Sequence, residues 1–288
     1  PAAGDQPSGQ LPPGTPPAAA PLDNGPPAAE APPGQAPEGP TPTTPAPDAP
    51  NAPVDQEAAA GTPDCSGTSA SPQTVRDLLL VLDHSKSMAL PADANATEIE
   101  GLEHIIETGR ASEVMKANRK YNQLIANAGT SRLDELKTTV REIVEGDPVD
   151  RNWSLITFAG CSGVSVKGTF SKAERPGLIG LVEKLKARPS TPLAKALESA
   201  LRHARSSGDH SAAVVLVTDG RDTCRGDPCA VAQTAGRDVP VHVVTIGQAT
   251  QHACIAEATG GQLFTSVRGA DLREVLSSAV RTATPEGC

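Results

Sequence analysis

Short apolar runs alternate with amphipathic stretches along most of this chain, beginning at Val75 and ending at Val280. The runs have the length of buried strands, and the stretches between them place apolar residues three and four apart, as one face of a helix does. Strands that alternate with helices favour a parallel sheet with helices on both faces. The expected strands are Val75–Leu82, Trp153–Phe158, Val164–Phe170, Val214–Val217, Val241–Ile246 and Leu263–Val267.

The first quarter of the chain has a different composition. Nineteen of the 28 prolines fall within residues 1–64, which contain no aromatic residue, lysine or arginine. Such a segment cannot bury enough apolar surface to offset its conformational entropy. We therefore expect a disordered Pro/Ala-rich linker at 1–73, one folded domain at 74–284, and a C-terminal tail at 285–288 that carries Cys288.

Charge and hydropathy limit the partners of the folded domain. Residues 1–64 hold −8 of the net charge of −9, which leaves the remainder at −1. Without a basic patch we expect no nucleic acid partner. An uninterrupted apolar run of about 18 residues, the length that spans a bilayer, is also absent, so we expect no membrane insertion within this chain.

The six cysteines indicate an oxidising compartment. They form an even set, lack the C-x2-C spacing of zinc sites, and occur in a chain that starts at Pro1 without methionine. We expect an extracytoplasmic protein that is secreted, periplasmic or anchored to the cell surface through a preceding N-terminal segment. Cys65 and Cys288 flank the domain and are expected to pair. For the other four we favour Cys161 with Cys224 and Cys229 with Cys254; a Cys224–Cys229 bridge is the alternative.

Three distant segments place small oxygen-bearing side chains just after a strand or at the start of a helix. The first expected strand runs into Asp83, Ser85 and Ser87; Thr191 precedes a helix; a later strand ends at Thr218-Asp219-Gly220. Carboxylates and hydroxyls are hard oxygen donors, which suit Mg²⁺ and not zinc. Each segment alone could merely cap a turn. Together they predict a divalent-cation site.

This D-x-S-x-S, T, D pattern resembles the metal-ion-dependent adhesion site of von Willebrand factor A domains, over about residues 74–284. The Asp219-Gly220-x-Asp222-Thr223-Cys224 run is similar to that of bacterial secreted members. The resemblance implies a doubly wound, mostly parallel six-stranded sheet, related to Rossmann folds, whose one antiparallel strand is the edge strand at 164–170. It also implies that the strands before Asp83 and Asp219 are central neighbours.

The resemblance further implies a function in protein binding. The expected metal ligands are Asp83, Ser85, Ser87, Thr191 and Asp219, with Mg²⁺ as the expected ion and Mn²⁺ or Ca²⁺ as alternatives. A protein ligand that presents an acidic residue would fill the open coordination position, as in adhesion domains. The alternative is an envelope-assembly subunit that docks another subunit constitutively and uses the metal structurally.

Enzyme motifs are not found, and we expect neither an enzyme nor a catalytic residue. Ser85 stands where a phosphatase of the haloacid-dehalogenase type needs its second aspartate, and the run from Gly160 to Gly163 is one residue too short for a G-x-S-x-G elbow. Phosphate-binding patterns of the forms G-x-G-x-x-G and G-x-x-x-x-G-K-[ST] do not occur.

An insert of about forty residues, 89–130, separates the serine motif from the next helix, whereas standard A domains connect the two almost directly. We expect helices around Glu98–Thr108 and Ala111–Ala126, with too few apolar residues to form a core of their own. Because the insert leaves the chain beside the expected metal, it is either a lid, a partner-specific surface or a peripheral segment.

Overall fold

A six-stranded sheet with helices on both faces forms the centre of the computed structural model, which describes residues 77–206, 212–247, 250–267 and 271–283. The strand order is β3-β2-β1-β4-β5-β6, and only the β2–β3 pair is antiparallel. The predicted fold class and the antiparallel edge strand are therefore confirmed. The strands are β1 (Asp77–Asp83), β2 (Asn152–Phe158), β3 (Val164–Phe170), β4 (Ala213–Thr218), β5 (Val241–Ile246) and β6 (Leu263–Ser266).

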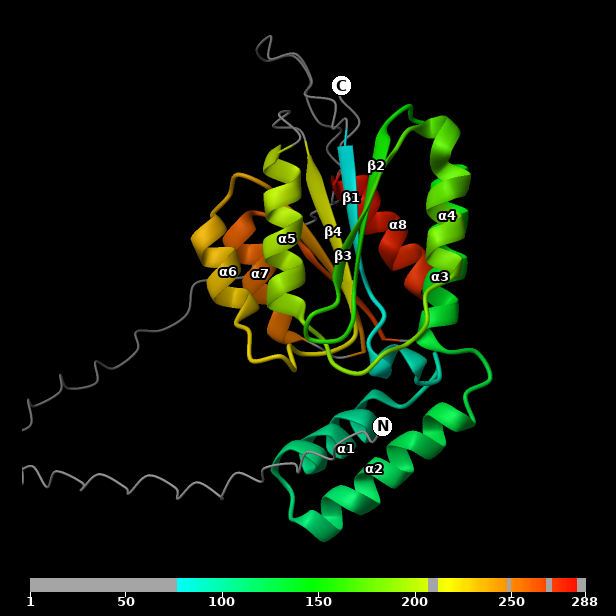
Figure 1. Ribbon diagram of the computed structural model, residues 1–288, viewed down its shortest axis with the longest axis vertical. Coiled ribbons are helices and arrows are strands. Elements are labelled where there is room, and N and C mark those ends of the chain that lie inside the picture. The colour runs from blue at the N-terminus through cyan, green and yellow to red at the C-terminus, as the bar shows by residue number, and fades with distance from the viewer. Residues whose placement is uncertain (1–76, 207–211, 248–249, 268–270, 284–288) are drawn as a thin grey trace, which may run out of the picture. The chain divides into compact units, whose positions relative to one another are not determined.

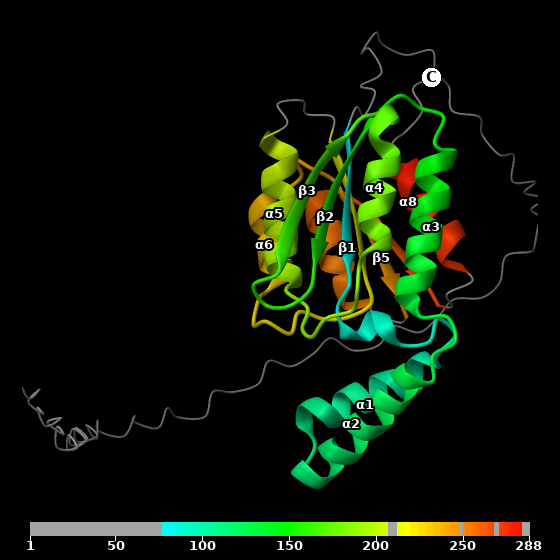
Figure 2. The same ribbon diagram turned by 45° about the vertical axis from the view of Figure 1, so that its right-hand side comes forward.

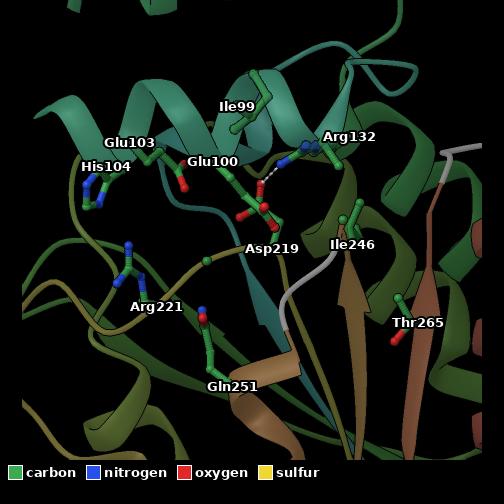
Figure 3. Close-up of a pocket in the computed structure, with 13 residues that line it drawn as sticks. Ile99, Glu100, Glu103, His104, Arg132, Asp219, Arg221, Ile246, Gln251 and Thr265 are labelled. Carbon is green, nitrogen blue, oxygen red and sulfur yellow. Dashed lines mark hydrogen bonds and ion pairs between the residues drawn. The ribbon is translucent and has the colours of Figure 1, made fainter. Parts of the chain in front are cut away.

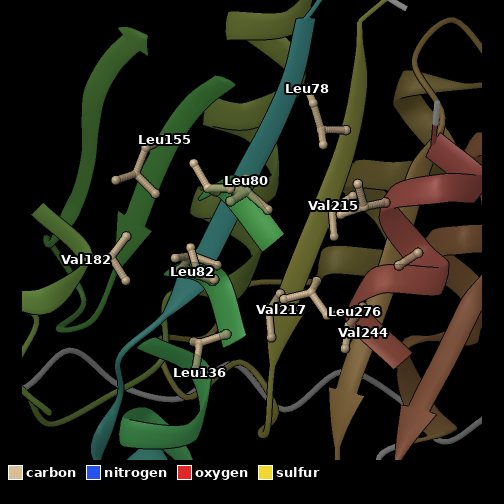
Figure 4. Close-up of a cluster of buried hydrophobic side chains, with 14 of the residues drawn as sticks. Leu78, Leu80, Leu82, Leu136, Leu155, Val182, Val215, Val217, Val244 and Leu276 are labelled. Atoms are coloured by element: carbon tan, nitrogen blue, oxygen red, sulfur yellow. The ribbon is translucent and has the colours of Figure 1, made fainter. Parts of the chain in front are cut away.

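Alternate residues of β1 face the two helical layers, because successive side chains of a strand point to opposite faces. Leu78, Leu80 and Leu82 belong to the apolar cluster on one face of the sheet, and Figure 4 shows Leu136 and Val215 in the same cluster. Leu79 and Val81 belong to the cluster on the opposite face. Because both faces are buried, β1 is a continuous apolar run.

Helices α3, α4 and α8 cover the first face, and α5, α6 and α7 cover the second (Figure 1). Crossover helices on both faces are what a parallel sheet requires. Their bounds are α3 Arg132–Gly146, α4 Arg175–Glu183, α5 Leu193–Ser206, α6 Pro228–Ala235, α7 Ala253–Thr259 and α8 Leu272–Ala283, with short 3₁₀ turns at Lys86–Ala89, Lys172–Glu174 and Thr250–His252.

The insert forms two helices, α1 (Ala96–Thr108) and α2 (Ala111–Ala126), close to the predicted positions. Figure 2 shows both beyond the end of the sheet at which β1 ends. The expectation that the insert lacks a core is wrong. Five buried apolar residues form a small cluster there: Leu90, Ile99, Leu102, Ala117 and Tyr121.

Several expectations lie outside the described residues: the linker at 1–73, the tail at 285–288 and the Cys65–Cys288 pair. No helix among the described residues is long and apolar enough to cross a membrane.

Candidate metal centre

The two predicted acidic ligands lie at the same edge of the sheet, because β1 and β4 are parallel neighbours. Leu82 pairs with Val217 in this register, so Asp83 and the Thr218-Asp219 pair follow side by side. β1 also pairs with β2 on its other side, so the strand order reverses here. Open α/β sheets bind ligands at such a point, beyond the carboxyl ends of the strands.

Asp83 is fully buried and both of its carboxylate oxygens accept hydrogen bonds. The Ser85 backbone N–H donates to Oδ1 at 2.7 Å, and the Thr218 hydroxyl donates to Oδ2 at 2.6 Å. Burial, together with the nearby charge of Asp219, raises the pKa of Asp83 to about 7. The site therefore holds two acidic groups close together in a buried environment.

A chain of hydrogen bonds continues from the first strand to Asp219. The hydroxyls of Ser85 and Ser87 lie 3.0 Å apart, and Ser87 Oγ donates to Asp219 Oδ1 at 2.6 Å. The Arg132 guanidinium donates from Nη1 to Asp219 Oδ2 at 2.9 Å. Four of the five predicted ligands are thus brought together, and Arg132 joins them as a residue that the sequence did not single out.

Thr191 is held in place through its backbone. Its N–H donates to Thr223 Oγ1 at 2.7 Å, and its carbonyl accepts from the Thr223 N–H at 3.0 Å. The loop before it runs beside the serine motif, because Ser85 forms a bridge with Arg188. Thr191 therefore lies at the start of α5, on a loop attached to both the first and the third ligand segments.

Asp222 fixes the loop that follows Asp219. Its carboxylate accepts the Ala194 N–H at the first turn of α5 and the N–H groups of Cys224 and Gly226. The Ala194 bond joins the Asp219 loop to α5, and the other two fix the loop itself. Asp222 thus has a structural role in the run that the sequence had suggested as a family feature.

The favoured disulfides are both present: Cys161–Cys224 and Cys229–Cys254. The first joins the β2–β3 turn to the loop after Asp219, and the second joins α6 to α7. The alternative Cys224–Cys229 bridge is excluded. No cysteine is free in the part of the chain that the structure describes.

All five predicted ligands are buried residues, with relative solvent exposures between 0% and 9%. A cleft of about 630 Å³ adjoins the centre, lined by α1 and by Arg132, Asp219, Arg221 and Gln251 (Figure 3). Figure 3 shows Glu100 and Glu103 extending from α1 toward this cleft. Among the five predicted ligands, only Asp219 lines this cleft.

Polar contacts connect the insert to the rim of the centre. Arg221 pairs with Glu107 of α1 at 3.0 Å, and the Tyr121 hydroxyl donates to Glu103 at 3.4 Å. The Lys86 ammonium lies 5.8 Å from the centroid of the Tyr121 ring. Burial and the charge of Asp219 raise the pKa of Glu103. The insert therefore contacts the rim of the centre and is not a distant appendage.

Clusters of three or more His, Cys, Asp or Glu with metal-binding geometry do not occur among the described residues. Any ion here would depend on the hydroxyl oxygens of Ser85, Ser87 and Thr191. Such neutral donors, with two acids nearby, are compatible with Mg²⁺ and poor for zinc.

Solved structures with a similar fold share little sequence with this chain. A von Willebrand factor type A structure from Catenulispora acidiphila is 16% identical with a TM-score of 0.51, and the match covers 72% of this chain and 42% of that one. The PilB minor pilin from Streptococcus sanguinis is 12% identical with a TM-score of 0.50, and the match covers 74% and 63%. These likenesses show the fold alone, and no curated protein matches the chain.

A match to a family profile assigns the chain to a protein family. The von Willebrand factor type A domain profile matches residues 78–221, which is half of the chain and extends from the first strand to just after Asp219. The match includes all three segments of the candidate centre. This chain therefore belongs to the von Willebrand factor type A domain family.

Proposed function

We propose that this chain is an extracytoplasmic protein-binding module in which a divalent cation mediates contact with an acidic side chain of the partner. Mg²⁺ is the ion we expect. Domains of this family generally mediate protein–protein interaction. To this general role we add four proposals: the cation, the acidic ligand, the absence of catalysis and the location outside the cytoplasm.

One observation carries the cation proposal: the Asp83, Ser85, Ser87 and Asp219 side chains converge at the carboxyl ends of two neighbouring strands. Their oxygen atoms are the donor type that Mg²⁺ prefers. Burial first, and then the charge of Asp219, raises the pKa of Asp83, so the two acids are close enough to interact. The donor set therefore fits the ion.

Each residue has a defined part in this proposal. Ser85, Ser87 and Thr191 provide neutral hydroxyl ligands, while Asp83 and Asp219 balance the charge directly or through water. Bound Mg²⁺ would supply a positive centre to which a carboxylate oxygen of the partner can bind. No bond is made or broken, in keeping with the missing nucleophile motifs.

The disulfides support the proposed location. Both bridges lie within the folded domain, and such bonds are rare in the reducing cytosol. An extracytoplasmic domain would also meet the millimolar range of divalent cations in which weak sites are filled.

Calorimetric titration with Mg²⁺ tests the proposal. Thr191→Val removes one hydroxyl at nearly constant volume and should weaken Mg²⁺ binding about tenfold or more. Thr234→Val is the matched control, because the Thr234 hydroxyl only bonds to Ala230 O on the exposed side of α6. If the unaltered chain fails to bind Mg²⁺, or if Thr191→Val binds as well as the control, the centre is misassigned.

The burial of all five ligands also favours a second candidate, in which the metal is structural and the domain docks constitutively in an envelope assembly. Chelation distinguishes the two. A structural ion predicts that chelation lowers the melting temperature strongly, whereas a weakly bound contact ion predicts lost partner binding with only a small fall in the melting temperature.

A further inference from the structure

Arg132 is buried where a surface residue would be expected. It is the first residue of α3, directly after the insert, and its side chain is 5% exposed while that of Asp219 is 0% exposed. An arginine at the start of a helix ordinarily extends into solvent. Here its guanidinium instead donates to Asp219 Oδ2 at 2.9 Å. Burial of both charged groups costs desolvation free energy, which this charge-assisted bond offsets.

The backbone around Arg132 holds it firmly. Its N–H donates to Leu90 O at 2.9 Å, and the Ala92 N–H donates to Thr130 O at 2.9 Å. Pro91 and Ser131 form a bridge between the two ends of the insert. The Ser131 hydroxyl also accepts from the Asp134 N–H at the start of α3. The backbone of Arg132 is therefore fixed on both sides, within reach of Asp219.

Asp219 has no oxygen left without a donor. Ser87 Oγ donates to Oδ1 at 2.6 Å and Arg132 Nη1 donates to Oδ2 at 2.9 Å. Each oxygen keeps a second lone pair, so a cation that bound Asp219 directly would share an oxygen with Ser87 or Arg132 and lie close to the guanidinium charge. The Arg132 bond is charge-assisted, a type roughly twice as strong as a neutral hydrogen bond.

The charges of the centre follow from these residues. When both carboxylates are ionised, they and the one guanidinium give −1, so a divalent ion would bring the centre to +1. Without Arg132 the loaded centre would be neutral. A carboxylate ligand gains more from a net positive centre in a buried environment, while the cation itself is held less tightly.

We propose that Arg132 is a positioning residue that disfavours direct binding of the cation by Asp219 and gives the loaded centre a net positive charge. It lowers cation affinity and raises the preference for a carboxylate ligand. The inference rests on the proposed cation function, and the experiment below separates the failure of the one from the failure of the other.

The test is calorimetric titration of the full chain with Mg²⁺. Arg132→Gln should tighten Mg²⁺ binding at least tenfold, and Arg132→Lys should stay within about threefold of the unaltered chain because it keeps the charge. Arg221→Gln is the matched control. It removes one positive charge from the same cleft at a half-exposed position, where solvent screens the charge, and should change the affinity less than threefold.

A gain in affinity cannot come from structural damage, which would weaken binding. Unchanged or weaker binding by a folded Arg132→Gln chain, with normal binding by the unaltered chain, overturns the inference alone. Absence of binding by every chain overturns the proposed function and the inference together. Binding by Arg132→Gln alone would mean that the unaltered chain does not load, which rejects the proposed function and, with it, the positively charged loaded centre.

A measurement on the unaltered chain covers the case in which Arg132→Gln does not fold. Nitrogen-15 NMR of the guanidinium should show slowly exchanging Arg132 protons both before and after Mg²⁺ is added. Loss of that protection on loading would mean that Asp219 leaves Arg132 for the ion, which contradicts the inference.

Discussion

The sheet and the insert use buried apolar residues in very different amounts. Two large clusters enclose the sheet, and β1 contributes fully buried side chains to both. The insert has one cluster of five buried residues, and its other contacts with the rim are polar and partly exposed. Regions with few buried contacts open at lower free energy than the core. We therefore expect the sheet to carry global stability and the insert to open independently.

Matched leucine truncations should give the largest difference between the two regions. Leu80→Ala in the centre of β1 should cost about 3 to 5 kcal/mol of unfolding free energy, because Leu80 is packed on the most crowded face of the sheet. Leu102→Ala in α1 should cost less than about 1.5 kcal/mol in the same urea denaturation experiment, because the region can open first. Equal costs would show that the insert unfolds as part of the sheet domain.

Replacement of the insert should have a smaller effect on stability. Exchange of residues 94–128 for a four-residue Gly/Ser linker preserves the backbone pairing between Ala92 and Thr130. Urea denaturation should show a change of no more than about 1 kcal/mol, because the ends are already adjacent and a short loop closes cheaply. Mg²⁺ affinity should stay within about threefold, since all five predicted ligands lie outside the replaced segment.

Binding measurements with the native partner and with an acidic peptide then distinguish the three interpretations of the insert. Weaker partner binding after the replacement would identify a recognition surface, and tighter binding of a generic acidic peptide would identify a lid. Unchanged binding of both would leave the insert peripheral and confine recognition to the rim.

The smallest expected effect is a pH dependence of the unfolding free energy that arises from a residue of the sheet. Burial lowers the pKa of His242 in β5, so the unfolded chain takes up a proton at a higher pH than the folded one. This contribution to stability is complete above the ordinary histidine pKa of about 6.5 and is lost as the pH falls through that value toward the lower folded pKa. Melting curves between pH 5 and about pH 8 should flatten in His242→Gln.

His242→Gln also tests the comparison between the stability of the sheet and that of the insert. His242 lies on a central strand, so its loss of stability should appear in global unfolding and leave hydrogen exchange in α1 and α2 unchanged. A pH effect confined to the two insert helices would contradict the assignment to the sheet.

The sheet could be predicted from the sequence because its signals are local. Each strand is a compact apolar run, and the three ligand segments follow strands or begin a helix whose positions the topology then determines. The insert cluster was missed because its members are spread from Leu90 to Tyr121 and meet only when α1 and α2 pack together. No local window contains that information.

Two residues of the centre were missed for different reasons. Thr218 directly precedes Asp219, and a hydroxyl beside a predicted ligand was an available signal. Arg132 gave no signal, because a charged residue at the start of a helix is ordinarily exposed, and only the tertiary structure brings it to Asp219. Desolvated ion pairs of this kind depend on which segments meet, which residue type alone does not encode.

The paired ends of the insert have a consequence for how such a protein can diversify. Ala92 and Thr130 are joined by a backbone hydrogen bond, and Arg132 lies two residues after Thr130. The segment between Ala92 and Thr130 can therefore be exchanged by recombination as a unit. Its surface can change in composition and length while the sheet, the ion ligands and the guanidinium beside them keep their places. Related proteins could then acquire new binding specificities through this one segment, and an engineer could graft a chosen binding loop at the same junction.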